Sequence, residues 1–165
     1  MNINKNKESR KHYGVKRVRN KLLQFLAKSS LLSGYMRSRL QKFRGVKFDD
    51  VSTVFLGEDI IIDGICPENV TIKNGCQIGA GTKIVTHYYD NKKLSDNEGY
   101  HFRFYEGKVL IEEDVFIGFN CVIAKPVTIG RGSVLGANTV ITNDVPPSSI
   151  IVNPSVINLK QEKIG

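Results

Sequence analysis

The sequence lacks long hydrophobic runs and has few cysteines. No stretch of about 18 apolar residues occurs, so we expect no membrane-spanning helix. The chain starts with polar and basic residues, which predicts no secretory signal peptide and a cytoplasmic location, with peripheral contact at the inner membrane face as an option. Cys66, Cys76 and Cys121 are odd in number, and we interpret them as small buried apolar residues. A disulfide framework and a metal site are therefore not expected.

Acidic residues are scarce in the first part of the chain. Residues 1–47 contain 14 Lys and Arg and a single acid, Glu8, a charge of +13. The remaining residues contain 10 basic and 15 acidic side chains, a charge of −5. Basic charge alone is weak evidence for nucleic-acid binding, and no nucleic-acid recognition motif accompanies it. Nucleic-acid binding is therefore not expected. The chain therefore divides into a basic arm and a mildly acidic remainder.

The basic arm also carries apolar residues at helical spacing. Residues 14–44 are predicted to be helical, with a break near Ser29–Ser30 or Gly34. The apolar stripe consists of Val18, Leu22, Leu23, Phe25, Leu26, Tyr35, Leu40 and Phe43. Two roles stay open for this helix. It can pack on the base of the molecule or on a neighbouring subunit, or it can contact an anionic membrane or polymer.

Aliphatic residues recur every six positions through the rest of the chain. One run is Ile111, Ile117, Ile123, Ile129, Leu135 and Ile141, and an earlier one is Ile60, Cys66, Ile72, Ile78 and Ile84. A period of six fits neither a helix nor a lone strand, and it is typical of a parallel β-helix. The residue after the aliphatic is often tiny, as at Gly118 and Gly136, which we expect to allow a bend with positive φ. The predicted fold class is all-β.

The phase of the repeat breaks between Ile84 and Ile111. The intervening residues cannot continue the coil, so a loop at about 88–108 is expected to leave it. The predicted organisation is a largely helical arm over 1–48, a β-helix domain over 49–157 that carries this loop, and a tail over 158–165.

His87 lies where the loop leaves the coil. Hexapeptide β-helices are associated with acyl transfer from a thioester, and acetylation of a hydroxyl needs a base to remove its proton. An imidazole, with an ordinary pKa of about 6.5, suits that role. Asp90 is the nearest carboxylate in sequence that can orient the ring, and a backbone carbonyl can serve equally. His101 either lines the acceptor pocket or packs in the loop. No metal site is expected, since His12 lies in the arm.

Residues 81–157 resemble the hexapeptide-repeat acetyltransferases of the galactoside, maltose and capsular-sugar O-acetyltransferase type. The closest likeness lies in the stretch VTIGRGSVLGANTVITNDVPPSSIIVNPSVI, which ends at Ile157. The resemblance implies a left-handed β-helix and a homotrimer. It also implies that acetyl-CoA binds in a groove between the β-helices of adjacent subunits and that a loop histidine is the general base. His87 occupies the position of that histidine.

The resemblance also implies roles for single residues. Ala137 matches a corner residue that contacts the pantetheine arm, and Thr142 and Asn143 match a pair near the distal end of the cofactor. Phe119 lies where a small polar residue often contacts the cofactor. The acceptor side is expected to include Tyr88, His101 and Phe116.

Further positions depart from the family pattern. Asn143 replaces a frequent lysine that contacts a cofactor phosphate, and Asn138 replaces a frequent glycine. Val152 precedes Asn153-Pro154, where the family usually has glycine. Asparagine adopts left-handed backbone conformations more readily than most residues, so the corner at Asn138 is expected to survive.

These observations lead to an acetyl-CoA-dependent O-acetyltransferase that acts on a sugar hydroxyl, as the leading hypothesis. The carbohydrate acceptor is expected to be a cell-surface or capsular glycan or its precursor. One alternative is N-acetylation of an amino sugar nucleotide. Another is a non-catalytic binding or scaffold protein on the same fold.

Overall fold

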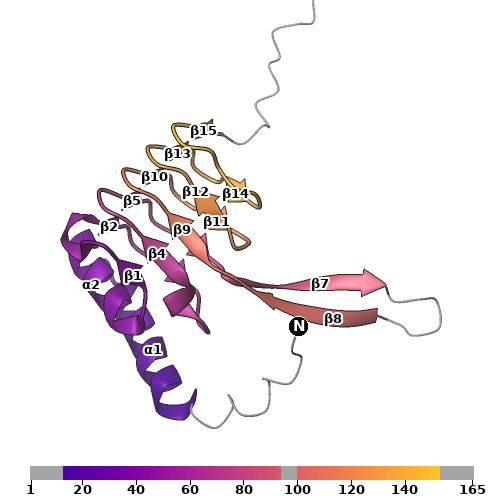
Figure 1. Cartoon of the computed structure of the whole chain (residues 1–165). Coiled ribbons are helices and arrows are strands. Elements are labelled where there is room, and N and C mark those ends of the chain that lie inside the picture. Colours follow the sequence, from indigo (N-terminus) through magenta and orange to yellow (C-terminus); the bar gives the residue numbers. More distant parts are fainter. Residues whose placement is uncertain (1–12, 94–99, 153–165) are drawn as a thin grey trace, which may run out of the picture.

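A stack of short parallel strands forms the centre of the molecule (Figure 1). The computed structural model describes residues 13–93 and 100–152. Three parallel sheets face one another, and each coil of the chain adds one strand to each sheet in turn. This arrangement confirms the predicted β-helix.

Each sheet is built from strands of two or three residues. The first sheet contains β1 (Lys47–Phe48), β4 (Val70–Ile72), β9 (Val109–Ile111) and β12 (Thr128–Ile129). The second contains β2 (Phe55–Leu56), β5 (Gln77–Ile78), β10 (Phe116–Ile117), β13 (Val134–Leu135) and β15 (Ile150–Ile151). The third contains β3 (Ile61–Ile62), β6 (Lys83–Ile84), β11 (Val122–Ile123) and β14 (Val140–Ile141).

The core is a ladder of aliphatic side chains inside the stack. In the second sheet, Ile117 pairs in register with Ile78 on one side and Leu135 on the other, and all three are buried. Because each coil places its aliphatic residue on the copy below at a strand spacing of about 4.8 Å, the six-residue period becomes a continuous apolar column. The predicted run from Ile111 to Ile141 is thus confirmed.

The small residue after each aliphatic has a different role from the one predicted. Gly118 does not have positive φ, and a Cβ atom built on it would lie 2.6 Å from the backbone nitrogen of Ala137 in the next coil. Small size is therefore required by the close approach of successive coils. Positive φ occurs elsewhere in the turns, at Gly81, Asn120 and Asn138. The expectation that Asn138 supports a left-handed corner is confirmed, with φ +60°.

The predicted phase was wrong in the first coil. The positions that pair with Ile78 and Ile84 are Leu56 and Ile62, whereas Ile60 and Cys66 were expected there; Ile60 is buried in the core at another slot of the coil. The reason is an insertion: ten positions separate Ile62 from Ile72, and the short 3₁₀ helix η4 (Pro67–Asn69) lies between them. A second 3₁₀ helix, η3 (Val51–Thr53), precedes β2.

The chain leaves the coil after β6, as the phase break predicted. Residues that were expected to form a loop contain β7 (His87–Lys93) and β8 (Tyr100–Glu106), which pair antiparallel with His87 opposite Glu106. This two-stranded sheet is separate from the three parallel sheets. The coil resumes at β9, where Ile111 stacks directly on Ile72.

Two helices precede the stack, so the description all-β is too coarse. They are α1 (Tyr13–Ala27) and α2 (Gly34–Arg44). The predicted break near Ser29 or Gly34 is confirmed. The Ser33 hydroxyl accepts a hydrogen bond from the Met36 amide at the start of α2, and Gly45, with φ +119°, ends the helix. The coil begins directly afterwards, at β1.

The helices pack across the base of the stack through polar side chains. Arg37 donates to the Leu56 carbonyl at 3.0 Å, Ser38 donates to the Val54 carbonyl at 2.7 Å, and Gln24 donates to the Ile60 carbonyl at 2.7 Å. These carbonyls belong to the first coil, which has no coil below it to supply backbone donors. The polar faces of the helices therefore complete the hydrogen bonding of an edge that would otherwise be unsatisfied.

Candidate active site at the histidine corner

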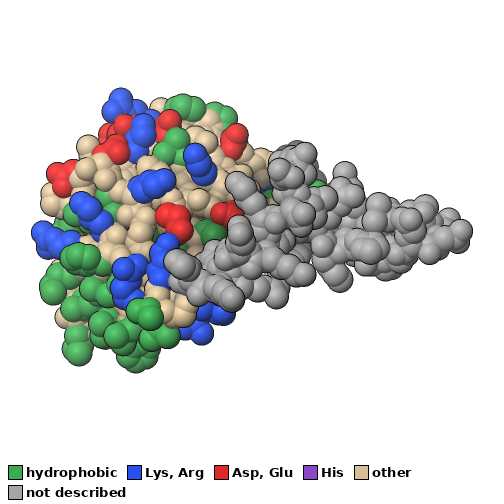
Figure 2. Space-filling model, turned by 60° about the horizontal axis from the view of Figure 1, so that its bottom comes forward, with side chains coloured by type: hydrophobic (Ala, Val, Ile, Leu, Met, Phe, Trp, Pro, Cys, Tyr) green, Lys and Arg blue, Asp and Glu red, His purple; other side chains and the backbone are tan. Residues whose placement is uncertain are grey.

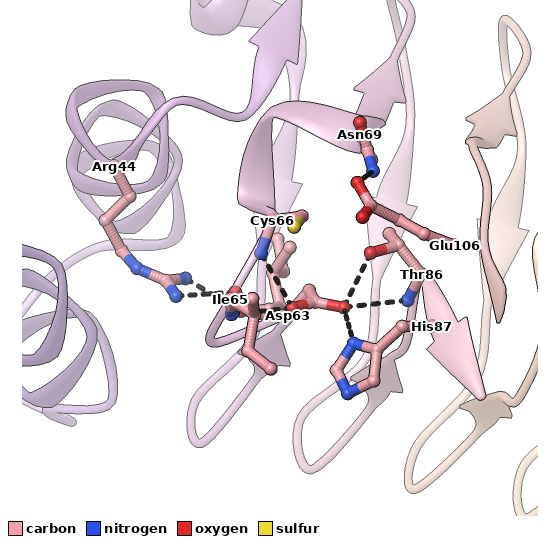
Figure 3. Close-up of polar contacts among 9 residues, drawn as sticks. Arg44, Asp63, Ile65, Cys66, Asn69, Thr86, His87 and Glu106 are labelled. Atoms are coloured by element: carbon pink, nitrogen blue, oxygen red, sulfur yellow. Dashed lines mark hydrogen bonds and ion pairs between the residues drawn. The ribbon is translucent and has the colours of Figure 1, made fainter. Parts of the chain in front are cut away.

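A buried carboxylate holds His87 at one corner of the stack (Figure 3). His87 Nδ1 lies 2.8 Å from Asp63 Oδ2, and the same oxygen accepts hydrogen bonds from the Thr86 amide at 2.9 Å and hydroxyl at 2.6 Å. Asp63 Oδ1 accepts from the amides of Ile65 at 2.7 Å and Cys66 at 3.0 Å. Asp63 is 3% exposed, so these contacts replace its hydration.

The hydrogen bonds keep Asp63 ionised. Burial alone would raise the pKa of this carboxyl, but the hydrogen bonds from Thr86, Cys66 and Ile65 outweigh burial and hold its pKa well below the ordinary value. An ionised carboxylate can only accept hydrogen bonds, so the proton between Asp63 and His87 belongs to His87 Nδ1. In neutral His87 the lone pair is therefore on Nε2, the nitrogen that can act as a base.

The geometry follows from the stacking of two coils. Asp63 follows β3, while Thr86 and His87 follow β6, and these strands pair with Ile62 opposite Ile84. The Asp63 amide continues the ladder by donating to the Ile84 carbonyl at 2.9 Å. Residues after paired strands lie one coil apart, about 4.8 Å, which is within reach of two short side chains.

Arg44 of α2 supports the backbone that carries Asp63. Its guanidinium donates to the carbonyls of Ile62 and Asp63, each at 2.9 Å, and to the side chains of Gln24 and Gln41. Burial lowers the pKa of Arg44 to about 10, although the Asp63 charge acts in the opposite direction. Arg44 is 1% exposed. The helices are thus linked to His87 through Arg44 and Asp63.

Two aromatic rings and one cation lie together at the start of the hairpin. Tyr88 stacks on Tyr105 across the hairpin, with ring centroids 5.3 Å apart. The Lys125 ammonium lies 5.2 Å from the centroid of the Tyr88 ring. Two aromatic side chains and a positive charge thus lie at the start of the hairpin, where Tyr88 directly follows His87 in β7.

The predicted cofactor residues fall at two different corners. We name the turn that follows the third sheet the histidine corner; His87 lies there after β6, and Thr142 and Asn143 lie there after β14. The Asn143 amide donates to the Thr142 hydroxyl at 3.3 Å, and both side chains are exposed. The opposite edge of the third sheet is the phenylalanine corner, where Phe119 and Ala137 precede β11 and β14.

Residues at the phenylalanine corner are stacked on one another. The Asn138 amide donates to the Phe119 carbonyl at 2.8 Å, and the Phe119 side chain is 60% exposed. Phe116 lies on the outer face of the second sheet, in the strand that leads into the phenylalanine corner. The structure thus brings Phe119 and Ala137 together, whereas Thr142 and Asn143 lie at the corner of His87 but two coils away from it.

Two predicted site residues have side chains outside the described part. Asp90 lies in β7 opposite Arg103, and His101 lies in β8 opposite Lys92. The orienting position on His87 Nδ1, for which Asp90 was suggested, is held by Asp63. His101 is five residues from Glu106, which faces His87, so about 17 Å of strand separates it from the histidine corner. The role of His101 in acceptor binding stays a prediction.

Sequence reasoning missed Asp63, Thr86 and Lys125. A signal for Asp63 existed. With the first coil in its observed phase, Asp63 follows the inward Ile62, a slot filled by glycine, alanine, valine or threonine in the later coils of the third and second sheets. An acidic residue at that slot departs from the pattern of the repeat. The insertion before β4 shifts the phase of the repeat, so the slot of Asp63 was not recognised.

Neither a metal cluster nor a membrane span is found in the described residues. Within 13–93 and 100–152, no group of three or more His, Cys, Asp and Glu side chains is placed to hold a metal ion. The expectation of no metal stays a prediction. In the same ranges, no helix is long and apolar enough to cross a membrane.

Known proteins share both the repeat and the fold. The family described as bacterial transferase hexapeptide (six repeats) matches residues 108–143. A Schizosaccharomyces pombe protein, named as an unproven acetyltransferase, is 32% identical over 83 residues, which are 50% of this chain. The chain spans 39% of the length of that protein.

Two solved structures have a similar fold. A hexapeptide-repeat-containing acetyltransferase of Vibrio cholerae O1 biovar eltor, complexed with acetyl-CoA, is 26% identical with a TM-score of 0.58, over 84% of this chain and 82% of that one. A maltose O-acetyltransferase of Clostridium difficile 630 is 22% identical with a TM-score of 0.52, over 84% of this chain and 81% of that one. The second likeness shows the fold alone.

Proposed function

We propose that this chain, which belongs to the hexapeptide-repeat acetyltransferase family, transfers an acetyl group from acetyl-CoA to a sugar hydroxyl with His87 as general base. One observation carries the proposal: an ionised, buried Asp63 binds His87 Nδ1 at the corner where the hairpin leaves the coil. This arrangement directs the basic lone pair to Nε2. A surface histidine with no role would not need a desolvated carboxylate with five hydrogen bonds behind it.

The residues of the site suit direct transfer. Acetyl-CoA, when bound, supplies an acetyl thioester. His87 Nε2 removes the proton of the acceptor hydroxyl as its oxygen forms a bond to the thioester carbonyl carbon. The carbon–sulfur bond then breaks, and the imidazolium returns the proton to the departing sulfur. Asp63 stabilises the imidazolium between these two steps and keeps the ring in place.

The outer face of the third sheet can hold the acyl donor. Lys83, Val122 and Val140 lie in one row between the two corners, and Val140 is 59% exposed. An apolar surface suits the pantetheine chain. Lys83 and Lys125 can pair with phosphate groups, and these cations can replace the lysine that the family often has at the position of Asn143. The acetyl-CoA complex of the Vibrio cholerae protein supports this donor.

The sugar acceptor rests on two observations. Residues 81–157 resemble sugar O-acetyltransferases, and Tyr88, which directly follows His87 in β7, stacks on Tyr105 across the hairpin. A tyrosine offers an apolar ring face and a hydroxyl, which together match the mixed surface of a sugar ring. Phe116 on the second sheet and His101 on the hairpin stay proposed acceptor contacts, and Asp90 stays a proposed member of the site.

A homotrimer would bring the two corners together. The histidine corner and the phenylalanine corner bound opposite edges of one sheet, so they cannot face each other within one chain. In a three-fold ring the contact is heterologous, and one corner of each copy meets the other corner of the next copy. The outer row of the second sheet is exposed and mostly apolar, as expected of such an interface; it contains Phe55, Gln77, Phe116, Val134 and Ile150.

The test is acceptor-dependent release of coenzyme A. Wild-type protein is incubated with acetyl-CoA and a panel of simple sugars, oligosaccharides, nucleotide sugars and amino sugar nucleotides, and free thiol is measured. We expect release with a hydroxyl acceptor and an ester product that mild alkali hydrolyses. An alkali-stable amide would show N-transfer instead. Light scattering should give three times the chain mass of 18.5 kDa.

Two results together would contradict the hypothesis that this chain is an acetyltransferase. If no acceptor releases thiol and acetyl-CoA does not raise the unfolding temperature, the chain does not bind the donor. The fold would then act as a binding or scaffold protein, and the contacts of Asp63 and His87 would be structural.

A further inference from the structure

An ordinary amphipathic helix buries its apolar side and exposes its polar side. Both helices of this chain have the opposite arrangement. In α2 the buried residues are Gly34, Arg37, Ser38, Gln41 and Arg44. The residues exposed to solvent include Tyr35, Met36 and Phe43, and Phe43 is 71% exposed. The polar side is used to cap the first coil, so the apolar side faces outward.

The same inversion occurs in α1. Asn20 and Ala27 are buried against the molecule, while the opposite side presents an apolar stripe. The stripe consists of Val15, Val18, Leu22, Phe25 and Leu26, whose exposed fractions run from 43% to 86%. An apolar groove of about 370 Å³ lies beside it, lined by Leu26, Leu32, Met36, Arg39, Leu40 and Phe43. We name this stripe and groove together the helical face.

The helical face is one continuous feature of the base. In Figure 2, where the lower side of Figure 1 is turned toward the viewer, hydrophobic side chains gather in one area with lysine and arginine side chains beside it. Monomeric soluble proteins rarely expose apolar patches of this kind without a partner. The charged side chains around the helical face indicate which kind of partner can cover it.

The charged side chains that the helices themselves carry are all positive. Residues 13–47 contain no acidic residue. At the helical spacing of about 100° per residue, Arg17 and Lys21 flank the stripe of α1 on one side and Arg19 flanks it on the other. Among the residues that the structure describes, Arg17, Lys21 and Arg39 form no ion pair within the chain, whereas Lys16 and Lys28 pair with acids of the coil.

The exposed apolar side chains and the unpaired cations together favour one kind of partner for the helical face. A second copy docked face to face would bring two sets of unpaired cations together, which is unfavourable. A hydrated anionic polymer would use the cations but would leave the exposed Phe25 and Phe43 in water. Residues 1–12 contain only Met1 and Ile3 as aliphatic side chains, too few to cover the area. An anionic lipid surface satisfies both the charge and the apolar residues.

We propose that the helical face binds the surface of an anionic phospholipid membrane. The apolar stripe enters the boundary between headgroups and acyl chains, and the flanking arginines and lysines contact lipid phosphates. The chain then lies on the membrane without crossing it. This inference does not depend on the acetyl-transfer proposal, since the apolar stripe and the cations beside it lie at the base of the stack (Figure 1) and none of them contacts His87 or Asp63 among the described residues.

The test is vesicle flotation of the full chain. We expect binding to vesicles of phosphatidylcholine mixed with phosphatidylglycerol, little binding to phosphatidylcholine alone, and weaker binding as salt is raised. The triple variant Val18→Ser, Leu22→Ser, Phe25→Ser should reduce the bound fraction at least tenfold. The charge variant Arg17→Glu, Lys21→Glu should do the same by a different mechanism.

Matched controls separate the face from general charge and apolarity. Lys108→Glu with Arg131→Glu makes the same change in net charge on the coil, and Val152→Ser removes an exposed apolar side chain beyond β15. Both should bind as wild type does. Circular dichroism and thermal unfolding establish that every variant is folded.

Three outcomes overturn the proposal. One is the absence of binding to anionic vesicles. Another is binding that neither helix variant weakens. A third is an assembly mass, measured by light scattering, that falls in the triple variant while no vesicle binding is seen, which would assign the helical face to a protein contact.

Discussion

Replacement of Asp63 by asparagine separates the role of the carboxylate from its shape. An amide has nearly the same size, but only one of its two polar atoms accepts hydrogen bonds. If the oxygen keeps the amides of Ile65 and Cys66, the NH₂ group faces the Thr86 amide and His87 Nδ1. The Thr86 N–H then has no acceptor. His87 is also driven to the tautomer with its proton on Nε2, where it cannot act as a base.

The structure sets the size of both effects. One buried N–H without an acceptor costs about 1–3 kcal/mol, and the loss of charge-assisted bonds adds to this, so we expect the free energy of unfolding to fall by about 2–4 kcal/mol. A wrongly protonated catalytic histidine lowers kcat by up to about 10⁴-fold, and we expect at least a 10²-fold loss here. The loss should appear in kcat rather than in KM for acetyl-CoA, because Asp63 is buried behind the imidazole.

The assay compares kcat and urea unfolding for wild type, Asp63→Asn and Asp59→Asn. Asp59 is an exposed acid that pairs with Lys28, so the same chemical change there should alter stability by less than about 1 kcal/mol. Rates are measured at a temperature where both variants are folded. A folded Asp63→Asn protein with kcat within about threefold of wild type would refute the tautomer argument.

The same variant gives a pH signature. The pKa of Asp63 is depressed in the folded state, so its contribution to stability is complete above the unfolded pKa of about 3.9 and is lost as the pH falls below it. Below about pH 5, where an ordinary imidazole is already protonated, the difference in unfolding free energy between wild type and Asp63→Asn should therefore shrink as the solution is made more acidic. A difference that does not shrink as the pH is lowered from about 5 to about 2 would contradict the ionised state assigned to Asp63.

Three further predictions test the cap, the core and the thiols. Arg44→Met should lower the free energy of unfolding by about 2–5 kcal/mol in urea titrations, because two glutamine side chains and two carbonyls lose their donor; an unchanged midpoint would contradict the capping role. Ile117→Ala, in the fully buried ladder, should cost about 2–5 kcal/mol and Ile117→Val about 0.5–1.5, and equal costs would contradict the stacked core. Burial raises the pKa of Cys66 to about 12, so its thiol should react with a disulfide reagent at pH 8 only after unfolding; rapid labelling of the native protein would show a wrong environment.

Much of the fold could be predicted from the sequence because its signal is periodic. The inward ladder from Ile72 to Ile141, the interruption after Ile84 and the two helices with a break near Gly34 are all confirmed. Each of these depends on local spacing. The phase of the first coil could not be predicted, since the insertion containing η4 shifts the repeat by four residues without changing its composition.

Only part of the site could be predicted from the sequence, for a related reason. His87 was found because it lies at the phase break, which is a local feature. Its partner Asp63 lies 24 positions earlier and becomes a neighbour only when β3 stacks on β6. Arg44 was even less accessible, because a basic residue on a basic helix gives no sign that it is buried. The apolar stripe of α1 was predicted correctly, but the polar face that packs on the coil was not.

The most direct test of acetyl transfer by this site is the rate of acceptor-dependent thiol release by His87→Ala. Binding of acetyl-CoA by the variant is measured in parallel, so that a loss of chemistry is distinguished from a loss of donor. We expect a fall in kcat of about 10²-fold or more with donor binding retained. A variant that binds acetyl-CoA and transfers the acetyl group as fast as wild type would show that His87 is not the base.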